Sequence, residues 1–152
     1  YEDEFATEKF NSLPHNELEL NEGDVIIRNS IQLATIVGKG NSGKIPSLNF
    51  TKVEFTCDKL DKRYFLYLLN VYKDVRHQKE RELQGNGAVL RIPLKALNQI
   101  IIPVPPIEQQ KKIGIIYTET LKLQNKLNKY GELIEQFTSS ILEDTLKGGA
   151  TK

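Results

Sequence analysis

The chain has 152 residues and is 39% hydrophobic, which is typical of one globular domain and excludes disorder throughout. Its single cysteine excludes an internal disulfide bond, and its two histidines are too few for a Cys/His metal cluster. The apolar runs fall far short of the roughly 20 residues of a membrane span, and nothing at Tyr1 resembles a signal peptide. We therefore expect a cytoplasmic protein. Because the chain begins at Tyr1 and contains no methionine, we expect its domain to be N-terminally incomplete.

The net charge of +1 conceals an uneven distribution of charged residues. Residues 1–22 contain seven acids and one lysine, a net charge of −6. Residues 23–100 contain thirteen lysines and arginines against seven acids, a net charge of +6, and the remainder sums to +1. An acidic segment is a poor surface for DNA, whereas lysine and arginine bind its phosphates. Any contact with nucleic acid is therefore expected in the middle segment.

Three strands are predicted in the first half of the chain. Residues 24–28 follow a turn signal and read as a buried strand, and residues 34–37, which end at Gly38, read as a second. Residues 49–57 are rich in β-branched and aromatic residues, which favours a third strand. We expect Cys57, at the end of this strand, to lie in the core rather than to be reactive.

The period of the apolar residues then changes from that of a strand to that of a helix. Residues 61–78 have apolar residues at helical spacing, with Asp58 or Asp61 available as N-cap, and predict one amphipathic helix. The glycines at 85–87 break the pattern, and short strands are predicted at 89–92 and 98–104. The prolines of 103–106 then close the globular part.

A single long helix is predicted from Ile107 to about Lys147, where the sequence contains no proline. About 40 helical residues would span roughly 60 Å. Apolar residues alternate in steps of three and four along it, which indicates a coiled-coil seam that a partner helix would cover. A helix packed on its own domain is the alternative. The seam residues are Ile113, Ile116, Leu123, Leu127, Tyr130, Ile134, Phe137 and Ile141, with Thr120 at one core position.

These elements predict an α+β fold, in which a small mixed α/β domain is followed by one long C-terminal coiled-coil helix. The expected boundaries are residues 1–106 for the domain, residues 107–147 for the helix and residues 148–152 for a disordered tail.

The junction between domain and helix, Gly87 to Ile113, resembles the DNA specificity subunits of type I restriction-modification systems. That family ends its target recognition domain with a glycine turn, a short strand, a Leu-x-x-Ile segment, a proline-rich stop and a Glu-Gln pair that opens a long helix. The matching residues here are 85–87, 97–100, 102–106 and Glu108 with Gln109. Residues 21–38 resemble the family's Gly-Asp strand pair, so the similarity covers about residues 20–146.

The resemblance implies a non-catalytic subunit with no cofactor of its own, which recognises one half of a split double-stranded DNA target and docks methyltransferase subunits. S-adenosylmethionine is expected on that methyltransferase partner, and a nuclease subunit would be recruited indirectly. Full-length members of the family carry two recognition domains, whereas this chain holds one. It is therefore expected to be either a fragment or a natural half-length subunit that dimerises through antiparallel helices on a palindromic site.

Two loops and one helical segment contain side chains suited to DNA. Arg28, Asn29 and Ser30 directly follow a strand, and arginine to guanine and asparagine to adenine are common base contacts. The segment 38–44 nearly matches a phosphate-binding loop, but Ile45 and Pro46 stand where a magnesium ligand and a helix are needed, so nucleotide binding is not expected. Its Lys39, Asn41, Ser42 and Lys44 are expected to contact DNA instead, with a plain exposed turn as the alternative.

The helical segment carries a basic run that is expected to bind phosphates: Lys73, Arg76, His77, Lys79 and Arg81. Interleaved acids make an ordinary charged face the alternative. Asn86, in the predicted turn, is a further candidate for DNA contact. His77 has no nearby nucleophile, so catalysis and a metal site are not expected. Two rival hypotheses remain: a coiled-coil protein–protein adaptor without DNA binding, and a small hydrolase or NTPase.

Overall fold

Strand β2 (Val25–Arg28) is the centre of a three-stranded antiparallel sheet with the strand order β3-β2-β4. It pairs with β3 (Leu33–Ile36) on one side and with β4 (Phe50–Val53) on the other, so that Ile27 lies opposite both Ala34 and Thr51. Val25 and Ile27 are fully buried, as is typical of an apolar strand between two neighbours. The computed structural model describes residues 5–6, 19–85 and 91–149, and the chain divides into two compact units, residues 1–115 and 116–152.

The first two predicted strands are confirmed, and the third is shorter than expected. β4 ends at Val53, and Cys57 lies beyond it and is exposed. The expectation that Cys57 belongs to the core is therefore wrong. Phe55 continues the alternating pattern of the sequence beyond the strand. It packs edge-on against Phe65, with the ring centroids 5.4 Å apart, so its apolar side chain does not indicate a strand residue.

Two helices stand where one was predicted. Helix α1 (Lys62–Asn70) begins at Asp61, whose carboxylate accepts a hydrogen bond from the Tyr64 amide at 3.0 Å, and α2 (Lys73–Glu82) follows directly. Tyr72 has an extended backbone between them, and the amides of both Val71 and Tyr72 donate to the carbonyl of Tyr67. The prediction of one helix over 61–78 is wrong because both helices bury apolar faces in the same core, which hides the break.

The segment between α2 and the long helix is less extended than predicted. Gln84 and Arg91 form a bridge of two backbone hydrogen bonds around the expected turn. Residues 86–90, which include the first half of the predicted strand 89–92, lie outside the described residues. The strand predicted at 98–104 shrinks to β5 (Ile102–Pro103), which pairs with β1 (Phe5–Ala6). The short helix α3 (Leu94–Leu97) precedes β5, and Asn98 remains helical, so the chain turns there instead of extending.

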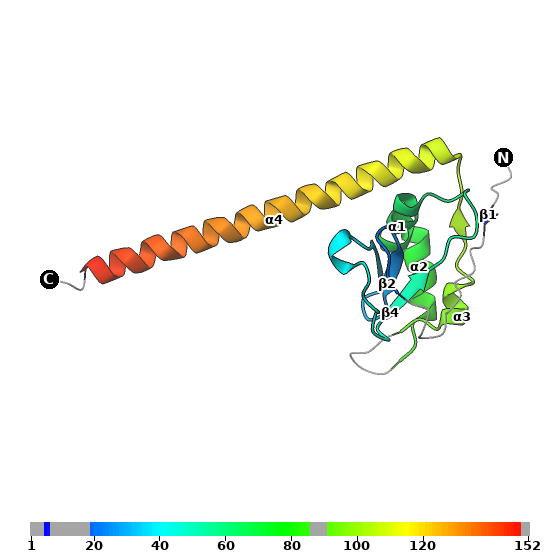
Figure 1. Ribbon diagram of the computed structural model, residues 1–152, viewed down its shortest axis with the longest axis horizontal. Helices are drawn as coiled ribbons and strands as arrows, with labels where there is room; N and C mark the ends of the chain where they lie inside the picture. Colours follow the sequence, from blue (N-terminus) through cyan, green and yellow to red (C-terminus); the bar gives the residue numbers. More distant parts are fainter. Residues whose placement is uncertain (1–4, 7–18, 86–90, 150–152) are drawn as a thin grey trace. The chain divides into compact units, whose positions relative to one another are not determined.

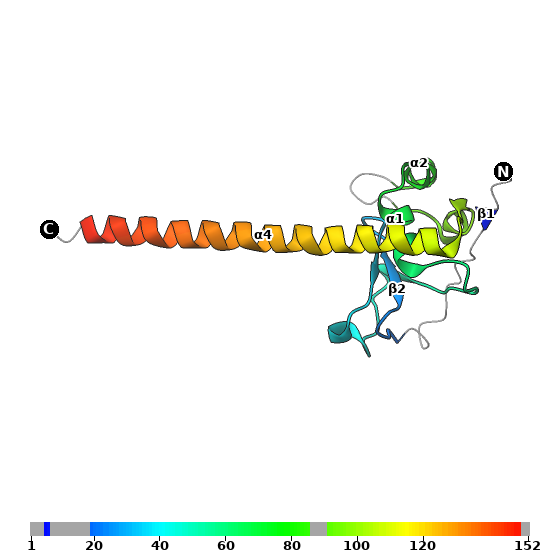
Figure 2. The ribbon, with the colours of Figure 1, turned by 90° about the horizontal axis from the view of Figure 1, so that it is seen from above.

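Helix α4 (Ile107–Gly149) is one uninterrupted helix of 43 residues, as Figures 1 and 2 show. It begins where the sequence predicts and ends two residues beyond Lys147. Residues 150–152 of the expected tail lie outside the described residues. Within the described ranges, no helix combines the length and the apolar character that crossing a membrane requires.

The first two turns of α4 are fastened to the domain by a buried amide and a glycine. Gln110 is fully buried; its Nε2 donates to the carbonyls of Lys59 and Pro105, and its Oε1 accepts from the Asp61 amide at 2.9 Å. One turn later, a Cβ atom on Gly114 would lie 2.7 Å from the Cβ of Arg63 and 2.8 Å from the Tyr64 amide nitrogen. Only glycine permits this close approach of α4 to the start of α1.

Gly114→Ala is expected to lower the free energy of unfolding by about 1–3 kcal/mol, because the added methyl group overpacks the contact with α1. The control is Gly131→Ala in the same helix, where a Cβ atom meets nothing within 4 Å. That variant should keep or raise stability, since alanine is the better helix former. Urea unfolding of both variants measures the difference, and equal stabilities would contradict the close contact.

Candidate nucleic-acid interface

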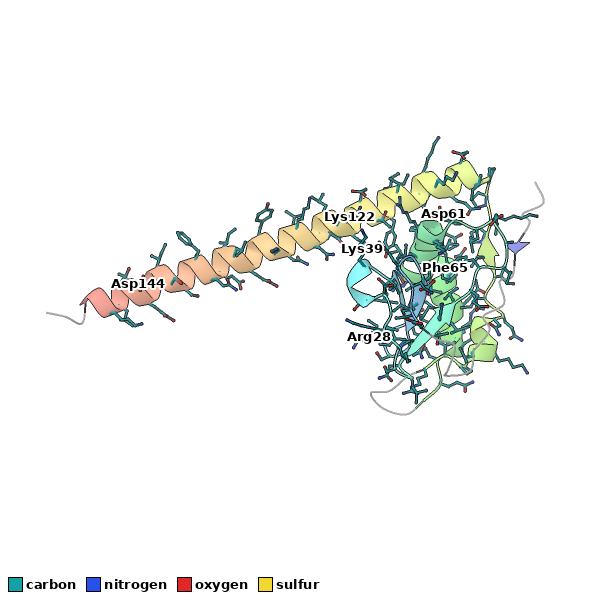
Figure 3. The ribbon with its side chains drawn as sticks, viewed as in Figure 1. Arg28, Lys39, Asp61, Phe65, Lys122 and Asp144 are labelled. Atoms are coloured by element: carbon teal, nitrogen blue, oxygen red, sulfur yellow. The ribbon has the colours of Figure 1, made fainter. Side chains whose placement is uncertain are left out.

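The residues predicted to contact DNA fall into groups at the two ends of the small sheet. At one end of β2, Arg28 pairs with Leu33 and Phe50, so residues 29–32 form the tip of the β2–β3 hairpin. At the other end, Val25 pairs with Ile36 and Val53, and the loop 38–44 follows there. Figure 3 labels Arg28 and Lys39, one from each group. The structure therefore does not bring the two predicted loops together into one site.

Asn29 ties the hairpin tip to the segment before β4. Its Nδ2 donates to the Leu48 carbonyl at 3.3 Å, its Oδ1 accepts from the Thr51 hydroxyl at 2.8 Å, and its amide donates to the Asn49 carbonyl. This side chain thus has a structural task that the sequence did not reveal. Arg28 and Ser30 on either side of it are exposed and available to a ligand.

Lys79 of α2 holds the other side of the tip. Its Nζ donates to the Gln32 carbonyl at 3.0 Å and to the Leu69 carbonyl, in the last turn of α1, at 2.6 Å. Gln32 has a φ of 53°, which is uncommon for a residue other than glycine. Lys79 is only 8% exposed, so the structure gives it a positioning role in place of the predicted phosphate contact. One ammonium group thereby joins α1, α2 and the hairpin.

The environment of Lys79 opposes its charge. Its pKa is lowered from the usual 10.5 to about 8, mainly by burial and also by the positive charge of Arg76, while the carboxylate of Glu80 opposes the shift. The ammonium form has three N–H donors and donates stronger, charge-assisted hydrogen bonds to the two carbonyls.

A pocket of about 390 Å³ lies between the hairpin tip and α2. It brings Ser30 beside the exposed Arg76, two residues that the sequence places far apart, while Glu80 supplies an acid at its edge. The Oε1 atom of Gln32 is buried without a hydrogen-bond partner, which is a cost that native structures usually avoid. The tip and the side of α2 that carries Arg76, Lys79 and Glu80 therefore line one pocket.

The loop 38–44 has a different character. It contains a 3-10 helix, η2 (Lys39–Asn41), and no α-helix starts at Lys44, as a phosphate-binding loop would require. The loop is pinned to Leu20 by two backbone hydrogen bonds, and the Lys44 Nζ donates to the Asn41 side chain at 2.8 Å. A Cβ atom on Gly43 would lie 3.7 Å from a carboxylate oxygen of Glu19. The carboxylate of Glu19 thus lies at this end of the sheet.

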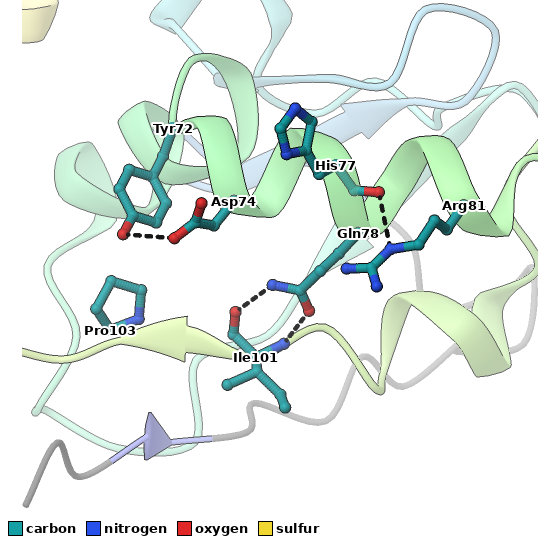
Figure 4. A pocket seen from close by; sticks show the side chains of 7 residues that line it. All are labelled: Tyr72, Asp74, His77, Gln78, Arg81, Ile101 and Pro103. Carbon is teal, nitrogen blue, oxygen red and sulfur yellow. Dashed lines mark hydrogen bonds between the residues drawn. The ribbon is translucent and has the colours of Figure 1, made fainter.

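His77 lies at a second pocket of about 360 Å³, shown in Figure 4. His77 and Arg81 line it with Tyr72, whose hydroxyl donates to Asp74. Lys73 is exposed in the first turn of the helix. Among the described residues, no group of His, Cys, Asp and Glu could hold a metal ion. Asn86 lies outside the described residues.

Sequence reasoning missed the side-chain amides that hold the domain together. Asn70 accepts from the Ala34 amide at 2.7 Å and donates to its carbonyl, so it satisfies the free edge of β3. Gln78 makes the same pair of bonds with the backbone of Ile101, drawn in Figure 4. The signal for Lys79 was present, because it lies four residues after the buried Val75 and therefore on the same helix face.

In the unmodified chain, the free energy of unfolding is expected to rise with pH above pH about 8, and Lys79→Met is expected to remove this rise. Between pH about 8 and about 10.5 the unfolded chain holds the Lys79 proton and the folded chain does not, so the free energy of unfolding rises there, by about 2–3 kcal/mol at most. The pKa of Tyr64, raised to about 12 mainly by burial, has the opposite effect above pH about 10 and is common to both proteins. Urea unfolding from pH about 7 to about 10 measures the rise.

The control for this experiment is Lys73→Met on the exposed first turn of the same helix. It should keep the rise of the unmodified chain, since Lys79 is intact. A Lys79→Met variant whose stability followed that of the control at every pH would refute the buried ammonium.

Comparison with known proteins identifies the family of the chain. Residues 8–136 match the family model of the type I restriction modification DNA specificity domain. The chain is also 25% identical over 141 residues to the type I restriction enzyme MjaVIII specificity subunit of Methanocaldococcus jannaschii, a match that covers 93% of this chain and 32% of the relative. The chain thus spans about a third of the length of the curated relative it matches.

The family is defined by DNA specificity, which supports sequence recognition and a role other than that of an enzyme. The family model matches well over half of the chain, and the matched residues include the small sheet and the first part of α4. The protein therefore belongs to the type I restriction-modification DNA specificity domain family.

Proposed function

We propose that the chain recognises one half of a bipartite DNA target through the tip of the β2–β3 hairpin and the adjoining face of α2. The observation that carries the proposal is the exposed trio of Arg28, Ser30 and Arg76, held around a tip that Asn29 and Lys79 fix in place. Cations position a protein on phosphates, and side chains held on a rigid scaffold can read base edges.

The distribution of charge favours this end of the sheet over the other. Glu19 lies near the loop 38–44, and at the same end of the sheet Lys52 forms an ion pair with Asp24 at 2.8 Å. A polyanion would meet these carboxylates there. At the hairpin tip the described pocket contains Arg76 and Lys79 against Glu80. We propose a secondary role, at the margin of the interface, for the polar residues of the loop 38–44, which are Lys39, Asn41, Ser42 and Lys44.

Replacing Arg28 or Arg76 with alanine is expected to weaken DNA binding and to lower the salt dependence of the association constant. For each phosphate that the protein no longer neutralises, the slope of log K against log salt concentration should fall by about 0.9. An arginine that reads a guanine should instead cost about 1–3 kcal/mol on the preferred sequence only. Fluorescence anisotropy with labelled duplexes, at several salt concentrations, distinguishes the two.

Lys122→Ala is the matched control, because Lys122 already pairs with Glu119 on the exposed part of α4. It should bind duplexes as the unmodified chain does. If the unmodified chain showed no salt-dependent affinity for any duplex, the adaptor hypothesis, a coiled-coil protein without DNA binding, would replace this one.

We further propose that α4 pairs with a second helix and docks a methyltransferase subunit. Beyond residue 115 its apolar seam is solvent-exposed within the single chain: Leu127 is 60%, Ile134 is 65% and Phe137 is 69% exposed. Such a seam is stable when another helix covers it. A homodimer with antiparallel helices would present two domains to a palindromic split site, and adenine methylation with S-adenosylmethionine would belong to the partner subunit.

Leu127→Asp combined with Ile134→Asp is expected to abolish self-association while residues 1–115 stay folded, because two carboxylates would enter the seam. Light scattering across a concentration series gives the mass. The control pair, Asn125→Asp with Gln136→Asp, places the same charges on the opposite face of the helix. A dimer that survived the seam substitutions would show that the seam lies elsewhere.

A further inference from the structure

Among the described aliphatic side chains at this end of the sheet, Ile31 of the hairpin tip and Leu48 of the segment before β4 are the most exposed. Ile31 is 52% exposed and Leu48 is 75% exposed. A single exposed aliphatic side chain needs no explanation. These two, however, belong to neighbouring segments of chain that Asn29 joins, through its bond to the Leu48 carbonyl and through its amide to Asn49. The exposed apolar surface therefore lies within the surface that carries Arg28 and Ser30.

The backbone that carries these side chains is fixed before any ligand arrives. On the Leu48 side, Thr51 and two carbonyls bond to Asn29. On the Ile31 side, the amide of Ile31 donates to the Arg28 carbonyl and Lys79 holds the next residue, Gln32. A tip restrained from both sides loses little conformational entropy on binding, so even a small apolar contact adds to affinity.

The charge around the pair identifies the ligand. Arg28 precedes Ile31 at the end of β2, and Arg76 lines the same pocket as Ile31. Aliphatic groups at an end of the sheet that also carries arginines complement a surface that is anionic overall and has small apolar groups. In the major groove of DNA, the apolar group at the base edges is the C5 methyl of thymine, and aliphatic side chains contact it.

We infer that Ile31 and Leu48 contact thymine methyl groups and so help to determine which half-site is recognised. This inference rests on the proposed recognition of DNA by the hairpin tip and adds the base that the apolar part of the tip selects. Arg28 and Ser30 then supply the polar contacts beside these methyl groups.

The experiment removes the methyl group from the DNA and its partner from the protein. The preferred duplex is first selected from a randomised library with the full chain. Each thymine of that duplex is then replaced in turn by deoxyuridine, which lacks only the methyl group. Affinities of the unmodified chain, Ile31→Ala and Leu48→Ala are measured on every duplex by anisotropy. Ile45→Ala is the control, because Ile45 is 69% exposed and follows the loop at the opposite end of the sheet.

At one or more positions, deoxyuridine should weaken binding of the unmodified chain about 4-fold, the effect of one buried methyl group. Ile31→Ala or Leu48→Ala should weaken binding to the thymine duplex by a similar factor and then be indifferent to deoxyuridine at that position. Ile45→Ala should behave like the unmodified chain on every duplex.

The inference would be overturned if the affinity losses from the alanine substitution and from deoxyuridine simply multiplied. It would also be overturned if the selected site contained no thymine, or if Ile31→Ala and Leu48→Ala bound as the unmodified chain does. In these cases DNA binding itself persists, so the proposed function stands. If no duplex is enriched by the unmodified chain at all, the proposed function falls and the inference falls with it.

Discussion

The ammonium group of Lys79 is the point on which the arrangement of the recognition domain depends. It satisfies a carbonyl in the last turn of α1, where helices leave such groups unpaired, and a carbonyl of the hairpin tip, while it belongs to α2. Three elements that are separate in sequence are thereby held by one side chain. A buried charge is costly, and its two bonds to carbonyls offset that cost only in this geometry. The shape of the tip is therefore coupled to the packing of both helices.

Side-chain amides extend the same principle through the domain. Asn70, Gln78 and Gln110 each use both the donor and the acceptor of the amide on backbone groups that no strand or helix satisfies. The small sheet has short strands and free edges, so many backbone groups need partners of this kind. At the start of α4, Gln110 combines this task with the close packing of Gly114. The long helix thus begins from a fixed position on the domain.

The strands β2 and β3 and the whole of α4 could be predicted from the sequence because their patterns are local. The break between α1 and α2 could not, since one apolar period runs through both helices and only the extended backbone of Tyr72 separates them. The residues that are candidates for DNA contact could be named from the sequence, but they could not be grouped in space. The pairing of β2 with β3 places Arg28 and Lys39 at opposite ends of the sheet, and the sequence of the loops does not reveal this register. Lys73 and Lys79 are both lysines of one charged helix. In the sequence, only the four-residue spacing of Lys79 from the apolar Val75 indicates that Lys79 lies on the buried face. Gln110 and Gly114 share a helix face by the same spacing, which is a signal for a close contact.

The hairpin tip is held almost entirely through main-chain acceptors. Asn29 binds the carbonyl of Leu48, and Lys79 binds the carbonyl of Gln32, so neither bond depends on which side chain stands at position 48 or 32. Every residue type has a carbonyl. A protein built in this way can exchange the side chains that face its ligand while the frame beneath them keeps its shape. Variation at positions 30, 31 and 48 is therefore an open route to new binding preferences at little risk to folding.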